Sequence, residues 1–257
     1  DVNHFHAAGG LGYMIGQLMS GGLLHKDVKT VAGEGLERYT QDPKLKDGAV
    51  EWVAGPTETL NDKILRPMGD PFQPTGGLKR LTGSLGNAVT KVSAVKPEQH
   101  VVEAPARVFH DQEAVKLAYK NGEFDEDVVV VVRFQGPKAN GMPELHSLTP
   151  VLANLQARGL QVALVTDGRM SGASGKVLSA IHVCPEALDG GPIARLQDGD
   201  VIRVDARDGR LEIVTPGVMD RALATADLSG NEHGQGRDLF AAFRKNVGAA
   251  DTGASSI

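Results

Sequence analysis

The sequence predicts an α+β fold that is mostly β: a β-barrel or sandwich with flanking helices, preceded by a mainly helical segment. Short β-branched runs separated by turn residues fill the chain beyond residue 71. Two amphipathic helical patterns interrupt these runs, and a third lies near the N-terminus. A chain of 257 residues is long enough to bury a substantial core.

The N-terminal part is expected to be a helix followed by a connecting region. Apolar side chains recur at helical spacing over residues 9–22, and the Gly21-Gly22 pair favours a helix C-terminus there. Residues 27–74 are polar and rich in Gly and Pro, which predicts a connecting region with short helices. We expect three parts: residues 1–70, a barrel over 71–220, and a C-terminal tail over 221–257.

The barrel part contains the predicted strands and two predicted helices. The strands are expected at 88–95, 106–109, 128–134, 162–166, 201–204 and 211–214. Asp208-Gly209 between the last two predicts a hairpin with a two-residue type I′ turn. Helices are predicted over 111–121 and 142–158, the second closed by Gly159.

Composition narrows the functional class. Lys and Arg are scattered singly among Asp and Glu at a net charge of −5, so neither nucleic acid nor a membrane is an expected partner. The apolar run 128–132 is too short to cross a bilayer, and no signal peptide is evident, so a cytoplasmic location is expected. The single cysteine, Cys184, cannot form an internal disulfide or hold a zinc or iron–sulfur site alone. Because the chain opens without Met, we expect a fragment of a longer protein.

A glycine-rich turn after the strand 128–134 delivers a carboxylate at Glu144. Pro143 suits the first turn of the predicted helix, since its missing N–H would have no partner there. Glu144 then either stabilises the helix through its dipole or serves as a ligand for a hard cation such as Mg²⁺. Spacing alone favours the structural interpretation.

A second glycine-rich loop, residues 167–176, follows the strand 162–166. Its glycines allow close backbone approach to an anion, and Ser171, held among such donors and near a metal, could act as a base once its own proton is lost. A plain surface turn fits the composition equally well. A nucleotide-phosphate loop is excluded by Met170 and Val177, and a serine-hydrolase elbow by Arg169.

Histidines occur in two alternating patterns. His4 and His6 would share one face of a strand and could then ligate a metal, although polar groups near a helix start are the commoner case. His182, Cys184 and Glu186 alternate similarly, and Pro185 favours a structural strand end there.

Six ordered motifs resemble the dihydroxy-acid dehydratase and 6-phosphogluconate dehydratase family from Asp1 to about Val214. They are Asn3-His4-Phe5-His6-Ala7-Ala8-Gly9-Gly10, Pro74-Thr75-Gly76-Gly77-Leu78, Gly83-Ser84-Leu85-Gly86, Gln135-Gly136-Pro137 with Met142-Pro143-Glu144, Thr166-Asp167-Gly168-Arg169-Met170-Ser171-Gly172, and Gly190-Gly191-Pro192-Ile193-Ala194 with Asp198-Gly199-Asp200. The resemblance implies a swivelling β-barrel preceded by the helical end of an N-terminal α/β domain.

The resemblance also implies site residues and cofactors. Glu144 is expected to bind Mg²⁺ or a similar divalent cation, Ser171 to be the base, and His6 to be an active-site neighbour. An iron–sulfur cluster, taken as the 4Fe–4S type, would be held by thiolates outside this chain, in an N-terminal cluster-binding domain. The full-length enzyme is expected to form a homo-oligomer, and the fragment alone to be inactive.

The opening motif resembles the 6-phosphogluconate branch, and Gly172-Ala173-Ser174-Gly175-Lys176 stands where the branched-chain amino-acid enzymes usually have Gly-Gly-Thr-Arg-Gly. The expected activity is therefore that of a hydro-lyase converting this sugar acid to 2-keto-3-deoxy-6-phosphogluconate, with Gly172, Ser174 and Lys176 binding the substrate. The alternatives are a dihydroxy-acid dehydratase of branched-chain amino-acid synthesis and, from another class, a non-catalytic β-barrel binding domain.

Overall fold

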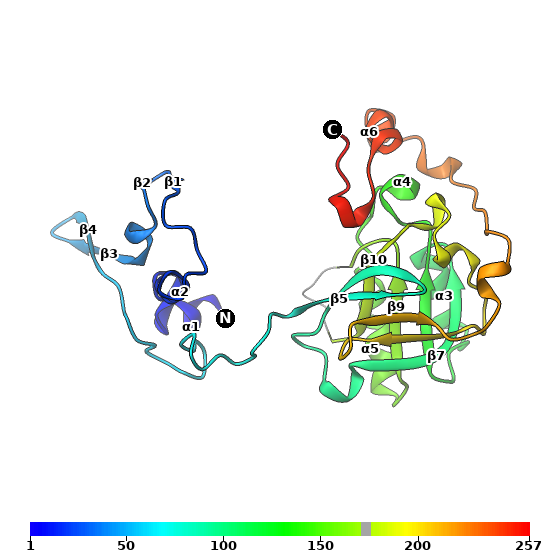
Figure 1. Ribbon diagram of the computed structural model, residues 1–257, viewed down its shortest axis with the longest axis horizontal. Helices are drawn as coiled ribbons and strands as arrows, with labels where there is room; N and C mark the ends of the chain where they lie inside the picture. The colour runs from blue at the N-terminus through cyan, green and yellow to red at the C-terminus, as the bar shows by residue number, and fades with distance from the viewer. Residues whose placement is uncertain (171–175) are drawn as a thin grey trace. The chain divides into compact units, whose positions relative to one another are not determined.

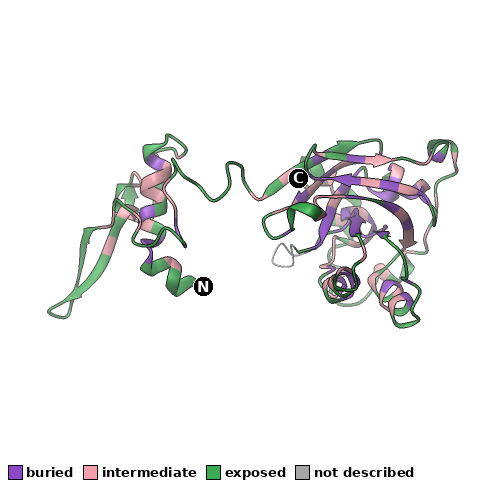
Figure 2. Cartoon of the chain, turned by 90° about the horizontal axis from the view of Figure 1, so that it is seen from below, coloured by how far each residue is buried: buried purple, intermediate pink, exposed green. Residues whose placement is uncertain are grey.

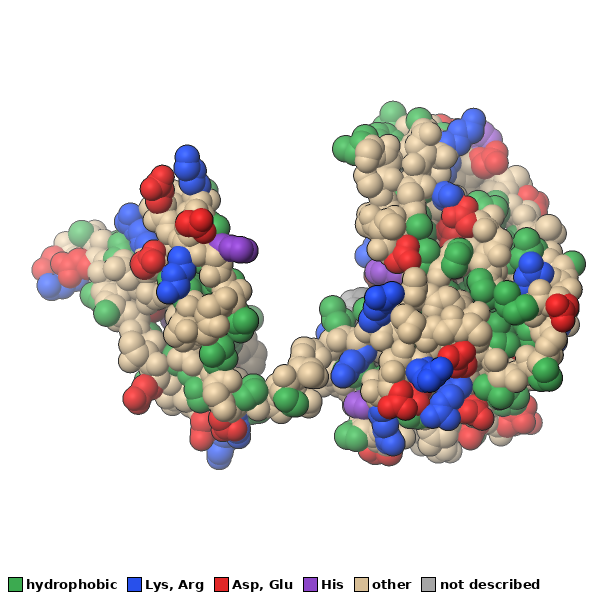
Figure 3. Space-filling view, viewed as in Figure 1, with side chains coloured by type: hydrophobic (Ala, Val, Ile, Leu, Met, Phe, Trp, Pro, Cys, Tyr) green, Lys and Arg blue, Asp and Glu red, His purple; other side chains and the backbone are tan. Residues whose placement is uncertain are grey.

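The computed structural model describes residues 1–170 and 176–257 and divides into two compact units, Asp1–Thr75 and Gly76–Ile257 (Figure 1). Each unit is described by itself. No helix in the described ranges is both long enough and apolar enough to span a bilayer. On the face of each unit seen in Figure 3, basic side chains are interspersed with acidic ones.

The first unit combines two helices with two β-hairpins. The helices are α1 (Val2–Ala7) and α2 (Gly10–Ser20), with a 3-10 turn η1 (Glu37–Thr40). The hairpins pair β1 (Lys29–Thr30) with β2 (Gly33–Glu34), and β3 (Gln41–Lys46) with β4 (Ala49–Ala54). The predicted N-terminal helix is confirmed, whereas the prediction of short helices over residues 27–74 is wrong for the hairpins.

The local cause of the second hairpin is the Asp47-Gly48 turn. Both residues have positive φ, 51° and 79°, and Lys46 pairs with Ala49 across them. This is the two-residue turn whose twist suits antiparallel strands, and Asp-Gly is among its favoured sequences. Pro43 and the charged residues of β3 obscured the strand pattern in the sequence.

The second unit is a closed barrel of eight strands with flanking helices, which confirms the predicted fold class and excludes the sandwich (Figure 1). The order around the barrel is β10-β6-β5-β12-β11-β7-β8-β9. The strands are β5 (Leu78–Gly83), β6 (Gly86–Lys91), β7 (Val101–Phe109), β8 (Val128–Val132), β9 (Val162–Thr166), β10 (Leu178–Cys184), β11 (Val201–Asp205) and β12 (Arg210–Ile213). Strands β5 and β10 lie outside the predicted set.

Helices connect β7 to β8 and β8 to β9, and one more helix follows the last strand of the barrel. The α-helices are α3 (Gln112–Lys120), α4 (Pro137–Asn140), α5 (Leu148–Ala157) and α6 (Ala241–Asn246). Short 3-10 turns are η2 (Pro97–Gln99), η4 (Ala187–Asp189), η5 (Pro192–Arg195), η6 (Val218–Asp220), η7 (Ser229–Asn231) and η8 (Ala250–Thr252). Asp111 caps α3 by accepting a hydrogen bond from the Ala114 N–H, a role for which Asp is favoured.

The helix predicted over 142–158 begins later, at Leu148. Gly141 and Met142 both have positive φ, 70° and 54°, which interrupts any helix at that point. Leu145 then donates its N–H to the Arg169 carbonyl, so this segment is extended beside the end of β9. Pairing with a distant strand therefore overrides the local helix signal of Pro143.

The barrel core has two layers, which appear as buried positions in Figure 2. Val129 and Val131 of β8 point into the barrel interior, whereas Val130 and Val132 pack in the layer that includes Leu152 of α5. A parallel strand covered on both faces is expected to be apolar throughout. This arrangement explains the uninterrupted valine run of β8.

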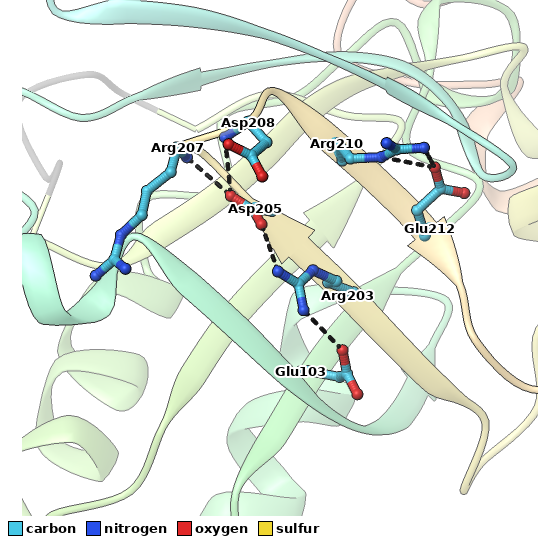
Figure 4. A network of polar contacts seen from close by, with 7 residues as sticks. All are labelled: Glu103, Arg203, Asp205, Arg207, Asp208, Arg210 and Glu212. Atoms are coloured by element: carbon cyan, nitrogen blue, oxygen red, sulfur yellow. Dashed lines mark hydrogen bonds and ion pairs between the residues drawn. The ribbon is translucent and has the colours of Figure 1, made fainter.

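The β11–β12 turn contains four residues, so the predicted two-residue turn at Asp208-Gly209 is wrong. Asp205 pairs with Arg210 across the turn. The Asp205 carboxylate accepts hydrogen bonds from the N–H groups of Arg207 and Asp208 at 2.9 and 3.0 Å and forms an ion pair with Arg203 (Figure 4). A side chain that captures the following N–H groups favours this wider turn.

Candidate active site

Four consecutive parallel strands place the candidate site at one end of the barrel. β7 pairs in parallel with β8, β8 with β9, and β9 with β10. Their carboxyl ends therefore meet at the same edge, where loops in α/β sheets commonly form ligand sites. The two glycine-rich segments found in the sequence both leave from this edge.

Glu144 lies beside the exit of β9. It forms an isolated parallel bridge with Arg169, and its Oε2 is 3.5 Å from Arg169 Nη1. The Glu144 side chain is 28% exposed, and its backbone is held by the bridge to Arg169. Because α5 begins only at Leu148, the interpretation of Glu144 as a first-turn helix residue is wrong.

Arg169 connects the two glycine-rich segments by hydrogen bonds. Its Nε donates a hydrogen bond to the Met142 carbonyl at 2.9 Å, and its carbonyl accepts one from Leu145 at 3.1 Å. The structure thus brings Glu144 against a residue that precedes Ser171 by two positions in the sequence.

Ser171, Gly172 and Ser174 lie outside the described residues. The chain is described again from Lys176, whose side chain is exposed, and Val177, which is buried. On the other side, Met170 is buried and its sulfur is 3.7 Å from the Thr149 hydroxyl. The roles of Ser171, Gly172, Ser174 and Lys176 stay predictions.

His6 belongs to helix α1 of the first unit. The strand interpretation of His4 and His6 is wrong, because residues two apart on a helix point in different directions. His4 lies next to Asp1, and the distance from His4 Nδ1 to the Asp1 carboxylate is 3.4 Å. His6 is exposed, and its role as an active-site neighbour stays a prediction.

Sequence reasoning missed two buried carboxylates at the same barrel edge. Asp167 is fully buried and accepts hydrogen bonds from the N–H groups of Phe134, Gln135 and Ala187 at 2.9–3.1 Å. Glu186 is 5% exposed and accepts from the Lys138 N–H at 3.0 Å. The position of Asp167 directly after a strand was an available signal, whereas the alternation of Glu186 with His182 and Cys184 indicated only a structural strand end.

The glycines at this edge allow the loops to touch. A Cβ at Gly136 would lie 1.6 Å from Glu186 Oε2, and a Cβ at Gly168 would lie 2.7 Å from Gln135 Cβ. Such distances are well inside van der Waals contact. The glycine richness that suggested ligand approach is therefore used, at these two positions, for contact between loops.

A buried arginine ties a further loop to the same edge. Arg133 Nη1 donates to the carbonyls of Ile193, Ala194 and Leu196 at 3.0–3.3 Å. Burial lowers the pKa of Arg133, and burial together with the nearby Arg133 charge lowers the pKa of His110. Neutral His110 is then able to accept the hydrogen bond that Arg133 Nε directs at its Nε2.

The donor set of the chain does not fit an iron–sulfur cluster. Cys184 is the only cysteine, it is buried, and its sulfur is 3.1 Å from the Asp251 carboxylate. Burial and this hydrogen bond raise the pKa of the Cys184 thiol, which disfavours the thiolate that a cluster requires. Within the described ranges, no three His, Cys, Asp or Glu side chains are grouped as a metal site.

We expect Glu186→Gln to flatten the pH dependence of stability. Burial, followed by repulsion from Asp167, raises the pKa of Glu186 from 4.5 to about 7. The folded state therefore binds this proton more tightly than the unfolded state, so the wild type loses stability as pH rises from 4.5 to 7. Glutamine carries no charge and retains an oxygen for the Lys138 N–H.

As the pH rises from 5 to 8, the free energy of unfolding of the variant should increase by about 2 kcal/mol relative to that of the wild type. Urea unfolding followed by circular dichroism measures this difference. Tryptophan fluorescence would not report on the barrel, because the only tryptophan, Trp52, lies in the first unit. The same pH dependence of the free energy of unfolding in the two proteins would contradict the raised pKa of Glu186.

Comparison with known proteins identifies the family. The model of the dihydroxy-acid/6-phosphogluconate dehydratase C-terminal domain matches residues 63–254. The phosphogluconate dehydratase of Rhizobium meliloti (strain 1021) is 57% identical over 260 residues, and that of Pseudomonas aeruginosa (strain PAO1) is 57% identical over 259. These matches cover the whole chain and 43% and 42% of the respective relatives.

A dihydroxy-acid dehydratase of Sulfurisphaera tokodaii is 41% identical over 214 residues, which cover 82% of the chain and 36% of that relative. The chain thus spans less than half the length of these curated relatives. The residues that carry the match include both glycine-rich segments at the carboxyl ends of β8 and β9. The chain belongs to the dihydroxy-acid/6-phosphogluconate dehydratase family and contains its C-terminal domain.

Proposed function

We propose that the chain is the C-terminal part of a cytoplasmic hydro-lyase that dehydrates 6-phosphogluconate to 2-keto-3-deoxy-6-phosphogluconate, in sugar-acid catabolism of the Entner–Doudoroff type. The observation that carries the site is the bridge between Glu144 and Arg169, which joins the two glycine-rich segments. The choice of substrate is supported by 57% identity over the whole chain to enzymes named phosphogluconate dehydratase, against 41% to a dihydroxy-acid dehydratase.

In this proposal each segment has one task. Glu144 presents a carboxylate on a fixed backbone, and Ser171 removes the proton from C2 of the substrate. Ser174, Gly172 and Lys176 bind the sugar acid, with the Lys176 ammonium suited to its phosphate. Loss of the C2 proton and of the 3-hydroxyl, which together make one water molecule, forms the C2–C3 double bond of an enol, which tautomerises to the 2-keto-3-deoxy acid.

A divalent cation such as Mg²⁺ fits the oxygen donors of Glu144 as one of its ligands. When bound, it would hold the substrate carboxylate and 2-hydroxyl and acidify the C2 proton. The iron–sulfur cluster expected for the family does not fit Cys184, so its ligands are assigned to an N-terminal cluster-binding domain. The full-length enzyme is proposed to be a homo-oligomer.

The test is a comparison of substrates in the full-length enzyme, purified without oxygen. Phosphogluconate should be dehydrated with a higher kcat/KM than dihydroxyisovalerate, measured as release of the 2-keto acid in a coupled assay. Preference for dihydroxyisovalerate would favour the dihydroxy-acid dehydratase, and turnover of neither would favour the non-catalytic binding domain.

A further inference from the structure

Asp167 joins three separate loops at the carboxyl ends of the parallel strands. Its Oδ1 accepts from the Gln135 N–H at 2.9 Å, and its Oδ2 accepts from Phe134 and Ala187 at 3.1 and 2.9 Å. Phe134 has a positive φ of 62°, a conformation that non-glycine residues rarely adopt without support. One carboxylate therefore stabilises an unusual backbone turn and fastens it to the exits of β9 and β10.

Two of these loops lead directly to the candidate site. The turn at Phe134 and Gln135 starts the segment that ends in Glu144, and Asp167 itself is two residues from Arg169. The Glu144–Arg169 bridge joins the same two segments a second time, beyond Asp167. The relative position of the Glu144 carboxylate and the Arg169 turn thus depends on Asp167 at one end and on the bridge at the other.

Burial of the Asp167 carboxylate costs free energy that an apolar side chain packed at the same position would not cost. Asp167 is fully buried, and within the described ranges its hydrogen-bond partners are backbone N–H groups, with no Lys or Arg at ion-pair distance. Burial raises the pKa of this carboxyl, so keeping the charge opposes folding. Carboxylates retained at such a cost are often found where geometry serves function.

We infer that Asp167 is a positioning residue for the dehydration: it sets the placement of the loop that carries Glu144 against the loop that continues to Ser171. The inference rests on the proposed function of these two residues. Asp167 touches neither substrate nor cation in this role. Its removal should therefore misplace the reacting groups without abolishing substrate binding.

The experiment compares Asp167→Asn with a matched control in the full-length enzyme. Asp205 is also buried, at 1% exposure, and also accepts two backbone N–H groups, and it differs from Asp167 in its ion pair with Arg203. It pairs with Val101 at the start of β7, at the barrel end opposite the site. Asp205→Asn therefore removes a similar buried carboxylate far from the reacting loops.

We expect Asp167→Asn to lower kcat by about 100-fold with little change in KM, because a displacement of about 1 Å costs a rate factor of this size. The kinetic isotope effect with substrate deuterated at C2 should increase, since proton removal becomes slower relative to the other steps. Asp205→Asn should leave kcat and the isotope effect of the folded enzyme unchanged.

A merely structural role would reduce the amount of folded enzyme and leave the isotope effect as it is. That result, or an equal kcat loss in Asp205→Asn, would overturn the inference. If Asp167→Asn does not fold, Thr166→Val is the second variant, because the Thr166 hydroxyl accepts the Gly168 N–H of the same turn at 2.9 Å. It should raise the isotope effect with a kcat loss of about tenfold, and an unchanged isotope effect would again overturn the inference.

Wild-type turnover separates this inference from the proposed function. If the wild type dehydrates dihydroxyisovalerate instead of phosphogluconate, the substrate assignment fails, and the variants are compared on the substrate that is used. The inference on Asp167 is then tested by the ratios of kcat and of the isotope effect between variant and wild type on that substrate.

Discussion

Ser171→Ala in the full-length enzyme is expected to lower kcat for phosphogluconate by a factor of about 100 to 10,000. General bases contribute rate factors of this size, and alanine lacks the side-chain oxygen that would accept the proton. KM should change little, because substrate binding is assigned to other groups. Steady-state kinetics with the coupled assay measure both constants.

The control for this variant is Ser179→Ala. Ser179 is buried in β10, eight residues further along the chain, and its hydroxyl donates to the Val177 carbonyl. Its loss should affect stability and leave kcat within about twofold of the wild type. The absorbance of the proposed iron–sulfur cluster should be unchanged in both variants. Full activity in Ser171→Ala would exclude Ser171 as the base.

The barrel itself was predictable because its buried strands carry strong local signals. The valine run of β8 and the apolar β9 are buried along their whole lengths, as parallel strands covered on both faces must be. β5 was not predicted, because Lys79 and Arg80 interrupt its apolar pattern on a partly exposed strand. The order of strands depends on contacts between distant segments, such as β10 with β6, which local patterns do not encode.

The candidate site was predictable only in part. The sequence indicates two strand exits rich in glycine, and parallel pairing brings these exits together. It does not indicate that Glu144 lies in an extended segment, because Pro143 resembles a helix start and the pairing partner, Arg169, is 25 residues away. Asp167 was quoted within a motif but had no role, since its three N–H donors come from two other loops.

The Asp-Gly turns show why identical local signals can differ in outcome. Asp47-Gly48 forms the two-residue hairpin turn with both φ positive. Asp208-Gly209 does not, because the Asp205 carboxylate, held by Arg203, binds the N–H groups of Arg207 and Asp208. An acidic residue three positions earlier thus decides the turn, and the dipeptide alone is insufficient.

The substrate phosphate gives the second large expected effect. In the full-length enzyme, Lys176→Met should raise KM for phosphogluconate about 10- to 100-fold, because a hydrogen bond to a charged group contributes about 1.5 to 3 kcal/mol. KM for unphosphorylated gluconate should hardly change. Lys176 is exposed and lies two residues before the start of β10, so the substitution removes charge without disturbing the core.

Lys116→Met is the matched control, because Lys116 lies on α3 and its ammonium is paired with Glu113. It should leave both Michaelis constants unchanged. Raising the salt concentration should weaken phosphogluconate binding in the wild type more than in Lys176→Met, since screening acts on a charge that the variant lacks. An equal rise of KM for both substrates in Lys176→Met would instead place Lys176 at the part of the sugar acid that they share, and would remove the electrostatic basis for assigning the phosphate to this loop.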